Sequence, residues 1–365
     1  MKLRISITPK TFWPAFTLRT SRGTIPSKTS YFVVLEAQGS LGIGEGAPLP
    51  SLSLDGEAEW QKLQAWLSAN PVQDVPEPGP AACYAWAHRL LAQAGLAHAS
   101  SLRYALECAA LSLTSGRPEV YFNNPYTQGS LPIEINGLVW MDDLAAMYTQ
   151  ALAKAAEGYT TIKFKIGSHA WADELAMLQA FRKRHLPEAV TIRVDANGAY
   201  KPDTALRVMD ELARLHVHSI EQPIAQGNFN AMRRLVAEGA TPVGLDEELI
   251  SPMPDDELAD MLAYVQAPYL ILKPTLIGGL QKTEAIIGLT QALGAHWWLT
   301  SSLETPIGLT ALAQFAAEHK AHLPQGLSTG QVYKTDLAHP NRRDGKYLLF
   351  DPGRPFDLGF LQAEA

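Results

Sequence analysis

Short apolar segments alternate with amphipathic segments along the chain from Ile133 onward, and one such pair occupies roughly 25 to 32 residues. The apolar segments have the length of buried strands, and the amphipathic segments 173–185, 203–215 and 308–320 have the hydrophobic period of helices. A repeated strand–helix pair of this size is typical of a (β/α)8 barrel of the TIM type, which closes with eight parallel strands. The segments expected to be strands are 133–139, 161–166, 191–196, 218–223, 242–247, 269–274, 296–301 and 325–330.

Residues before about 125 follow a different pattern. Three strand-like segments precede helix-like segments in this region, which is typical of an α+β unit. The tail, which contains the apolar segment KYLLFDPG, has no barrel unit left to build, so we expect it to pack on the first unit. We therefore predict an α+β capping domain over residues 1–125, with residues 337–365 packed on it, and an α/β barrel domain over residues 126–336.

The composition narrows the classes of partner. Of the 365 residues, 47% are hydrophobic, and the net charge of -7 arises from interspersed acidic and basic residues. No basic stripe is present that could follow a phosphate backbone, so nucleic acid is not an expected partner. The segment MKLRISITPKTFW lacks the continuous apolar core of a signal peptide, and no later run approaches a spanning helix. We expect a cytoplasmic protein with no membrane partner. The sequence does not fix the oligomeric state, so a homo-oligomer stays an alternative.

Two lysines flank Phe164 in the predicted strand 161–166. Because side chains alternate across a strand, Lys163 and Lys165 should lie on one face, where two like charges need a partner. The partners follow in the sequence, since an acidic or basic residue also ends each of four later apolar segments. These residues are Asp195, Glu221, Asp246 and Lys273.

The active site of such a barrel lies at the carboxyl ends of its strands, where all six charged side chains would converge. Three carboxylates at one barrel mouth need a neutralising cation, and a set of ligands made of oxygen alone favours a hard ion such as Mg²⁺, with Mn²⁺ as an alternative. Such a site suits removal of a proton alpha to a carboxylate, because the resulting enediolate needs strong charge stabilisation. A small-molecule carboxylate is therefore the expected substrate.

A single charged residue in a strand is most often a solvated residue at a rim, but an ordered set of six is hard to explain in that way. Asn197 and Glu247 are weaker candidates, since Asn-Gly is a turn signal and Glu247 alternates away from Asp246. Glu248 shares a face with Asp246, so the ligand register stays open. Thr300 and Ser301 end another strand, where their hydroxyl groups could hold an anionic substrate group.

Several of these segments together resemble the enolase superfamily, in its muconate-lactonising-enzyme subgroup, and the resemblance covers nearly the whole chain. Within the subgroup it is strongest to the o-succinylbenzoate synthase family. It implies a capping α+β domain, formed from both termini, on a modified (β/α)7β barrel. The early segment GEGAPLPSLS resembles the capping-domain loop that closes over the substrate. The other segments are IKFKIG, RVDANGAY, SIEQPI, GLDEEL, LILKPTLIGG and WWLTSSLETPIGL.

The resemblance also implies a role for each charged residue. Lys165 would be the general base and acid, Lys163 would assist by its charge, and Lys273 would stabilise the enediolate. The ligands of Mg²⁺ would be Asp195, Glu221 and Asp246. The implied reaction is the dehydration of 2-succinyl-6-hydroxy-2,4-cyclohexadiene-1-carboxylate to 2-succinylbenzoate, a step of menaquinone synthesis, and Thr300 and Ser301 match a position that contacts the succinyl carboxylate.

Two alternatives stay open. Dipeptide epimerases and N-acylamino acid racemases share the same lysines and carboxylates. Dipeptide epimerases usually carry an Asp-x-Asp pair after the eighth strand, whereas QGLSTGQVYKTD has no acid before Asp336, which counts against that function. A catalytically inactive barrel that serves as a binding or scaffold protein is the second alternative, and the intact set of six charged residues argues against it.

Overall fold

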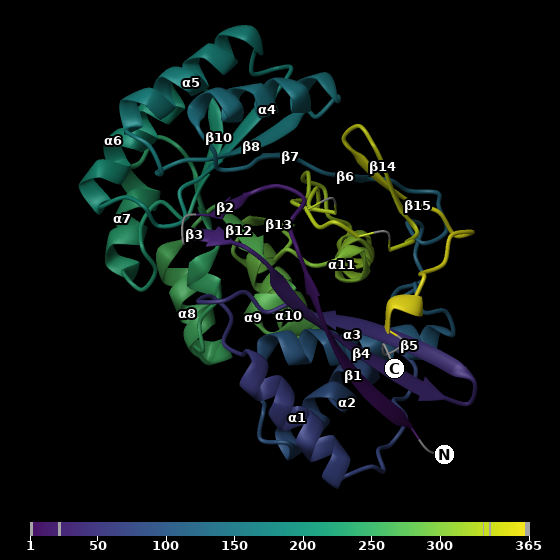
Figure 1. Ribbon diagram of the computed structural model, residues 1–365. Helices are drawn as coiled ribbons and strands as arrows, with labels where there is room; N and C mark the ends of the chain where they lie inside the picture. The colour runs from purple at the N-terminus through teal and green to yellow at the C-terminus, as the bar shows by residue number, and fades with distance from the viewer. Residues whose placement is uncertain (1–2, 21–22, 331, 336, 362–365) are drawn as a thin grey trace.

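A parallel seven-stranded sheet forms the centre of the protein (Figure 1). The computed structural model describes residues 3–20, 23–330, 332–335 and 337–361. Each strand of this sheet pairs with the next one along the chain, which is the topology expected from repeated strand–helix units. The strands are β7 (Gly137–Val139), β8 (Thr161–Lys165), β9 (Thr191–Asp195), β10 (Val217–Glu221), β11 (Val243–Leu245), β12 (Tyr269–Leu272) and β13 (His296–Leu299).

The eighth strand position is filled by Gln325 and Gly326. Parallel bridges join Gln325 to Ile135 on one side and Gly326 to Thr300 on the other, so these residues close the sheet into a barrel. The prediction of a longer strand over 325–330 is wrong, because the chain enters a turn at Ser328. Consecutive Ser, Thr and Gly residues favour such a turn over a strand. The predicted modified (β/α)7β barrel is confirmed, because seven strands form one sheet and Gln325 and Gly326 close it.

Helices follow the first seven barrel strands and cover the outside of the sheet (Figure 1). The predicted helices over 173–185, 203–215 and 308–320 are confirmed within a few residues at each end. None of the described helices is long and apolar enough to cross a membrane. The barrel helices are α4 (Leu144–Ala156), α5 (Trp171–Arg184), α6 (Pro202–Ala213), α7 (Phe229–Glu238), α8 (Asp255–Val265), α9 (Pro274–Ile277), α10 (Gly279–Ala292) and α11 (Pro306–Glu318).

The N-terminal region forms a separate antiparallel sheet, with strand order β1-β4-β5, and helices beside it. Glycines on β5 allow the last of these helices, α3, to approach closely, because a Cβ atom at Gly44 would collide with the carbonyl oxygen of Ala105. A two-stranded hairpin, β2–β3, branches from this region. The elements are β1 (Arg4–Phe12), β2 (Leu18–Thr20), β3 (Gly23–Ile25), β4 (Lys28–Ala37), β5 (Ser40–Gly46), α1 (Glu57–Ala69), α2 (Pro80–Gln93) and α3 (Ser100–Ser115).

The C-terminal tail contacts both parts of the molecule. Its hairpin of β14 (Asn341–Asp344) and β15 (Tyr347–Phe350) adds β6 (Ile133–Glu134) as a third antiparallel strand. The ring of Phe360, in the short helix η2 (Gly359–Leu361), lies 5.1 Å from the ring of Phe32 on β4. The domain limits stay a prediction, and their end points at residues 1, 336 and 365 lie outside the described residues.

Candidate active site

A cavity of about 290 Å³ opens at the carboxyl ends of the barrel strands. Barrel residues form one wall, and the β2–β3 hairpin with residues 49–52 forms another. The early segment GEGAPLPSLS thus contributes to the cavity wall, where the family resemblance places it. Barrel side chains that line the cavity include Lys163, Lys165, Asn197, Lys273, Thr300 and Ser301.

Lys163 lies between two carboxylates. Its Nζ atom is 2.8 Å from Asp195 Oδ2 and donates to both carboxylate oxygens of Glu221 at 2.7 Å. The strand register explains this contact, because Asp195 pairs with Glu221 across β9 and β10. Phe164, the intervening residue, points to the helical layer, where its ring packs against Phe181. The predicted alternation of β8 is confirmed.

Lys165 lies at the end of β8, directly opposite Asp195 in the sheet register. Its Nζ atom donates to Asp195 Oδ2 at 2.6 Å and to Asn197 Oδ1 at 2.9 Å. Asn197 in turn donates from Nδ2 to Glu247 Oε1 at 3.1 Å. Asn197 therefore orients the lysine ammonium group and also turns the chain, with φ at 44°.

Lys273 follows β12 on the other side of the barrel, and its Nζ atom donates to Asp246 Oδ2. The second oxygen, Asp246 Oδ1, is buried and has no hydrogen-bond partner among the described residues. After Asp246 the chain enters a 3-10 turn, η1 (Glu247–Leu249), so strand alternation ends there. Glu248 accepts from the backbone N–H of Gly227 at 2.9 Å, which directs it away from Asp246.

Thr300 and Ser301 lie at the carboxyl end of β13, as predicted, but their hydroxyl groups have protein partners. Ser301 Oγ donates to Glu304 Oε2 at 2.7 Å and accepts from the backbone N–H of Leu303 at 2.9 Å. Thr300 Oγ1 makes one longer bond, of 3.3 Å, to the carbonyl oxygen of Gly326. The Ser301 hydroxyl thus shapes this loop, and contact with substrate stays a prediction for both residues.

Several residues of the cavity wall were not among the predicted site residues. Asn136 Oδ1 and Thr329 Oγ1 are buried without a hydrogen-bond partner among the described residues, and both side chains line the cavity. Arg19 and Trp140 line it as well. The sequence held one signal for these residues, since Asn136 is a polar residue within the predicted strand 133–139. Asp336, the first acid after the eighth strand, lies outside the described residues.

Comparisons with known proteins show the family of this chain. Residues 146–356 match a family model described as Enolase C-terminal domain-like. The o-succinylbenzoate synthase of Desulfotalea psychrophila is 38% identical over 346 residues, which cover 90% of this chain and 94% of that protein. The chain belongs to the o-succinylbenzoate synthase family of the enolase superfamily. Members of this family are lyases, so the inactive scaffold alternative loses its support.

This o-succinylbenzoate synthase family member is similar to solved structures over nearly its whole length. The crystal structure of MenC from Desulfotalea psychrophila has a TM-score of 0.80 at 32% identity, covering 96% of this chain and 100% of that chain. A substrate-liganded L-Ala-D/L-Glu epimerase from Bacillus subtilis has a TM-score of 0.82 at 23% identity, covering 98% of each chain. The second likeness shows a shared fold alone.

The charges of this o-succinylbenzoate synthase family site perturb one another strongly. Burial acts to lower the pKa of Lys163, but the carboxylates of Asp195 and Glu221 outweigh it and raise that pKa above its ordinary value. Burial would raise the pKa of Asp195, yet the Lys163 and Lys165 ammonium groups hold it well below its usual range. Burial and then repulsion from Asp195 raise the pKa of Glu221 well above its usual range.

The residues present fit a hard divalent cation. Asp195, Glu221 and Asp246 offer only oxygen atoms from three adjacent strands, are fully buried, and repel one another. The partnerless Asp246 Oδ1 adds an unused acceptor. Within the described ranges, no three acidic, histidine or cysteine side chains converge closely enough to hold a metal as they stand. Lysine ammonium groups pair with all three carboxylates here, so a cation would have to displace those contacts.

Proposed function

We propose that this protein catalyses the Mg²⁺-dependent dehydration of 2-succinyl-6-hydroxy-2,4-cyclohexadiene-1-carboxylate to 2-succinylbenzoate and water, a step of menaquinone synthesis. One observation carries the proposal. In a member of the o-succinylbenzoate synthase family, three lysines and three carboxylates gather at one barrel mouth, and all three lysines line the same cavity. Removal of a proton alpha to a carboxylate requires such a concentration of charge.

In this reaction Lys165 takes the proton from the ring carbon that carries the carboxylate, and the electron pair of that C–H bond moves into the carboxylate to give an enediolate. Asp195, Glu221 and Asp246 would hold Mg²⁺, which supplies positive charge to the developing dianion when bound. Lys163 adds a fixed positive charge beside the base. Its pKa, raised by the carboxylates after the opposing effect of burial, keeps it protonated.

The second half of the reaction uses the same base in reverse. The enediolate electrons return to the ring as the bond to the hydroxyl group breaks, and Lys165 donates its proton so that the hydroxyl leaves as water. Lys273 reaches the cavity from β12, whereas Lys165 reaches it from β8, and three strands lie between them in the sheet. Lys273 can therefore stabilise the enediolate from the opposite side.

The placement of Lys165 and Lys273 also favours a second candidate function. Epimerisation of a dipeptide or racemisation of an N-acylamino acid moves a proton from one face of an alpha carbon to the other, and amines on both sides of the cavity could perform it. An L-Ala-D/L-Glu epimerase of Bacillus subtilis is 29% identical over 210 residues, covering 57% of this chain and 56% of that protein. We rank this function below dehydration because that relative covers less of the chain.

The deciding experiment is a direct assay of the purified protein with Mg²⁺ on the cyclohexadiene substrate, following its ultraviolet absorbance as the ring becomes aromatic. We expect rapid conversion that EDTA abolishes. The same preparation is given dipeptides and N-acylamino acids in D₂O, and deuterium entry at the alpha carbon is measured. Folded protein that fails on the cyclohexadiene but exchanges the alpha proton of an amino acid derivative would replace dehydration with the second function.

A further inference from the structure

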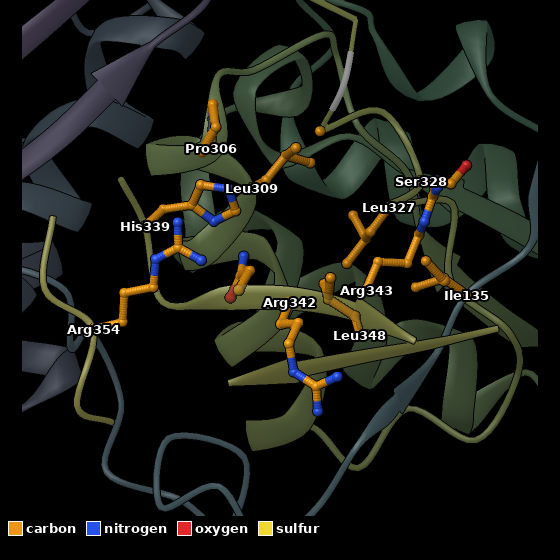
Figure 2. Close-up of a pocket in the computed structure, with 12 residues that line it drawn as sticks. Ile135, Pro306, Leu309, Leu327, Ser328, His339, Arg342, Arg343, Leu348 and Arg354 are labelled. Atoms are coloured by element: carbon orange, nitrogen blue, oxygen red, sulfur yellow. The ribbon is translucent and has the colours of Figure 1, made fainter. Parts of the chain in front are cut away.

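A second cavity has a volume of about 240 Å³ (Figure 2). It adjoins the catalytic cavity, because Ser328 lines both. Its walls come from the start of α11, the segment after the eighth strand, and the β14–β15 hairpin. We call it the arginine pocket, because Arg342, Arg343 and Arg354 line it together with His339. None of the described residues that line it is acidic, although the whole chain carries a net charge of -7.

Two of the arginines mark opposite ends of the arginine pocket. Figure 2 shows Arg354 extending toward His339 at one end and Arg343 extending toward the other end. The guanidinium group of Arg354 has no hydrogen bond or ion pair with another described residue. That of Arg343 has a loose contact with Glu157, since Nη2 lies 3.6 Å from Oε2, and it also interacts with the Tyr159 hydroxyl group. Both groups therefore have N–H donors available for a ligand.

His339 adds a neutral polar group beside Arg354. Burial and then the Arg354 charge lower the pKa of His339 to about 4, so its ring is uncharged at neutral pH. Its Nδ1 atom is buried and has no hydrogen-bond partner among the described residues. A buried polar atom left without a partner costs free energy, which a ligand atom placed beside it would recover.

The floor between the two charged ends is apolar. Leu309, Leu327 and Leu348 line it, and Figure 2 shows Leu309 and Leu327 between His339 and Arg343. A single compact anion such as phosphate could engage one end but would leave the apolar floor and the other guanidinium unused. A ligand with an anionic group at each end and an apolar body between them uses all of these features.

We propose that the arginine pocket binds a small dicarboxylate with an apolar body. Each carboxylate would accept two parallel hydrogen bonds from one guanidinium group, the geometry in which arginine binds carboxylates best. The volume is slightly below the roughly 300 to 1,000 Å³ of pockets for drug-sized ligands, which restricts the ligand to a small molecule. Ser328 lines both this pocket and the catalytic cavity, so the test must separate the two sites.

The test uses terephthalate, a benzene ring with carboxylates at opposite positions, as the probe and the whole chain in EDTA at physiological ionic strength. Isothermal titration calorimetry should show saturable binding of one equivalent. Arg354→Gln and Arg343→Gln should each weaken binding at least tenfold. Arg214→Gln is the matched control, because Arg214 is an exposed arginine at the end of α6, outside the arginine pocket. Lys165→Ala, which alters only the catalytic cavity, should bind terephthalate as the parent does.

Three results would overturn the proposal. The first is no saturable binding of terephthalate to folded parent protein. The second is retention of binding in both pocket variants together with its loss in Lys165→Ala, which would place the probe in the catalytic cavity. The third is equal weakening by Arg214→Gln and the pocket variants, which would mean that the anion is attracted to arginine side chains in general and has no binding site. Circular dichroism spectra of all variants establish that lost binding does not reflect unfolding.

Discussion

The ammonium group of Lys163 lies 2.7 Å from both carboxylate oxygens of Glu221, although 58 residues separate the two in the chain. The same nitrogen lies 2.8 Å from Asp195 Oδ2. Lys163 is thus placed between two of the three carboxylates proposed to bind Mg²⁺. Metal binding at this barrel mouth must therefore compete with, and rearrange, a buried lysine–carboxylate network.

Replacing the proposed base should stop the chemistry without disturbing the fold. Lys165→Ala removes the amine that exchanges the proton, and we expect the dehydration rate to fall by about 10²- to 10⁴-fold or more. The rate is measured by ultraviolet absorbance, with Lys183→Ala, an exposed lysine on α5, as the control. Activity of Lys165→Ala within tenfold of the parent would assign the base to another residue.

Loss of one carboxylate charge should weaken the metal site. Glu221→Gln keeps the side-chain size but removes an anionic ligand, so Mg²⁺ affinity should fall at least about tenfold in calorimetric titration. Glu238→Gln, which alters an exposed carboxylate on α7, serves as the control. Equal Mg²⁺ affinity in parent and Glu221→Gln would remove Glu221 from the ligand set.

Mg²⁺ should also raise the melting temperature, because it binds the folded state preferentially. At a free concentration 100 times the dissociation constant, the expected stabilisation is about 2.7 kcal/mol. Asp246→Asn should reduce the shift, since Asp246 Oδ1 is the buried acceptor without a partner. The measurement is differential scanning calorimetry over a range of Mg²⁺ concentrations, and a melting temperature that never responds would contradict a used metal site.

The Ser301 hydroxyl should matter for stability. Ser301→Ala leaves a buried Glu304 oxygen with one donor fewer and the Leu303 N–H without an acceptor, so the free energy of unfolding should drop by about 1–3 kcal/mol. Thr300→Val, which removes a single bond of 3.3 Å, should cost less. Urea denaturation compares the two, and a larger loss for Thr300→Val would refute this view of the loop.

Glu107 should make the protein less stable as the pH rises. Burial raises the pKa of Glu107 from 4.5 to about 8. The folded state therefore holds a proton that the unfolded state has lost, and stability falls between pH 4.5 and about 8, by up to about 1.4 kcal/mol per pH unit. Glu107→Gln keeps an oxygen acceptor for the Leu280 N–H and should flatten this dependence in denaturation curves. An unchanged slope would show that Glu107 is not its source.

Much of the barrel could be predicted from the sequence because periodicity is a local property. Alternation along β8 places Lys163 and Lys165 on one face whatever surrounds them, and the charged residues that end several strands must reach the same barrel mouth. The eighth strand was overestimated, because its polar end satisfies a turn as well as a strand, and only its two bridges with neighbouring strands decide between them.

The sequence by itself determined the order of strands and helices, and which residue types stand at the strand ends. The tertiary structure alone decided which of these residues pair, because pairing depends on the stagger between strands and on chain turns that no local pattern records. In the folded chain Lys163 pairs with Glu221, and Asn197 bonds to both Lys165 and Glu247. Glu248, in η1, bonds to the Gly227 N–H and lies away from Asp246. The arginine pocket has the same origin, since it joins residues from α11, the segment after the eighth strand and the tail that become neighbours only when the barrel closes.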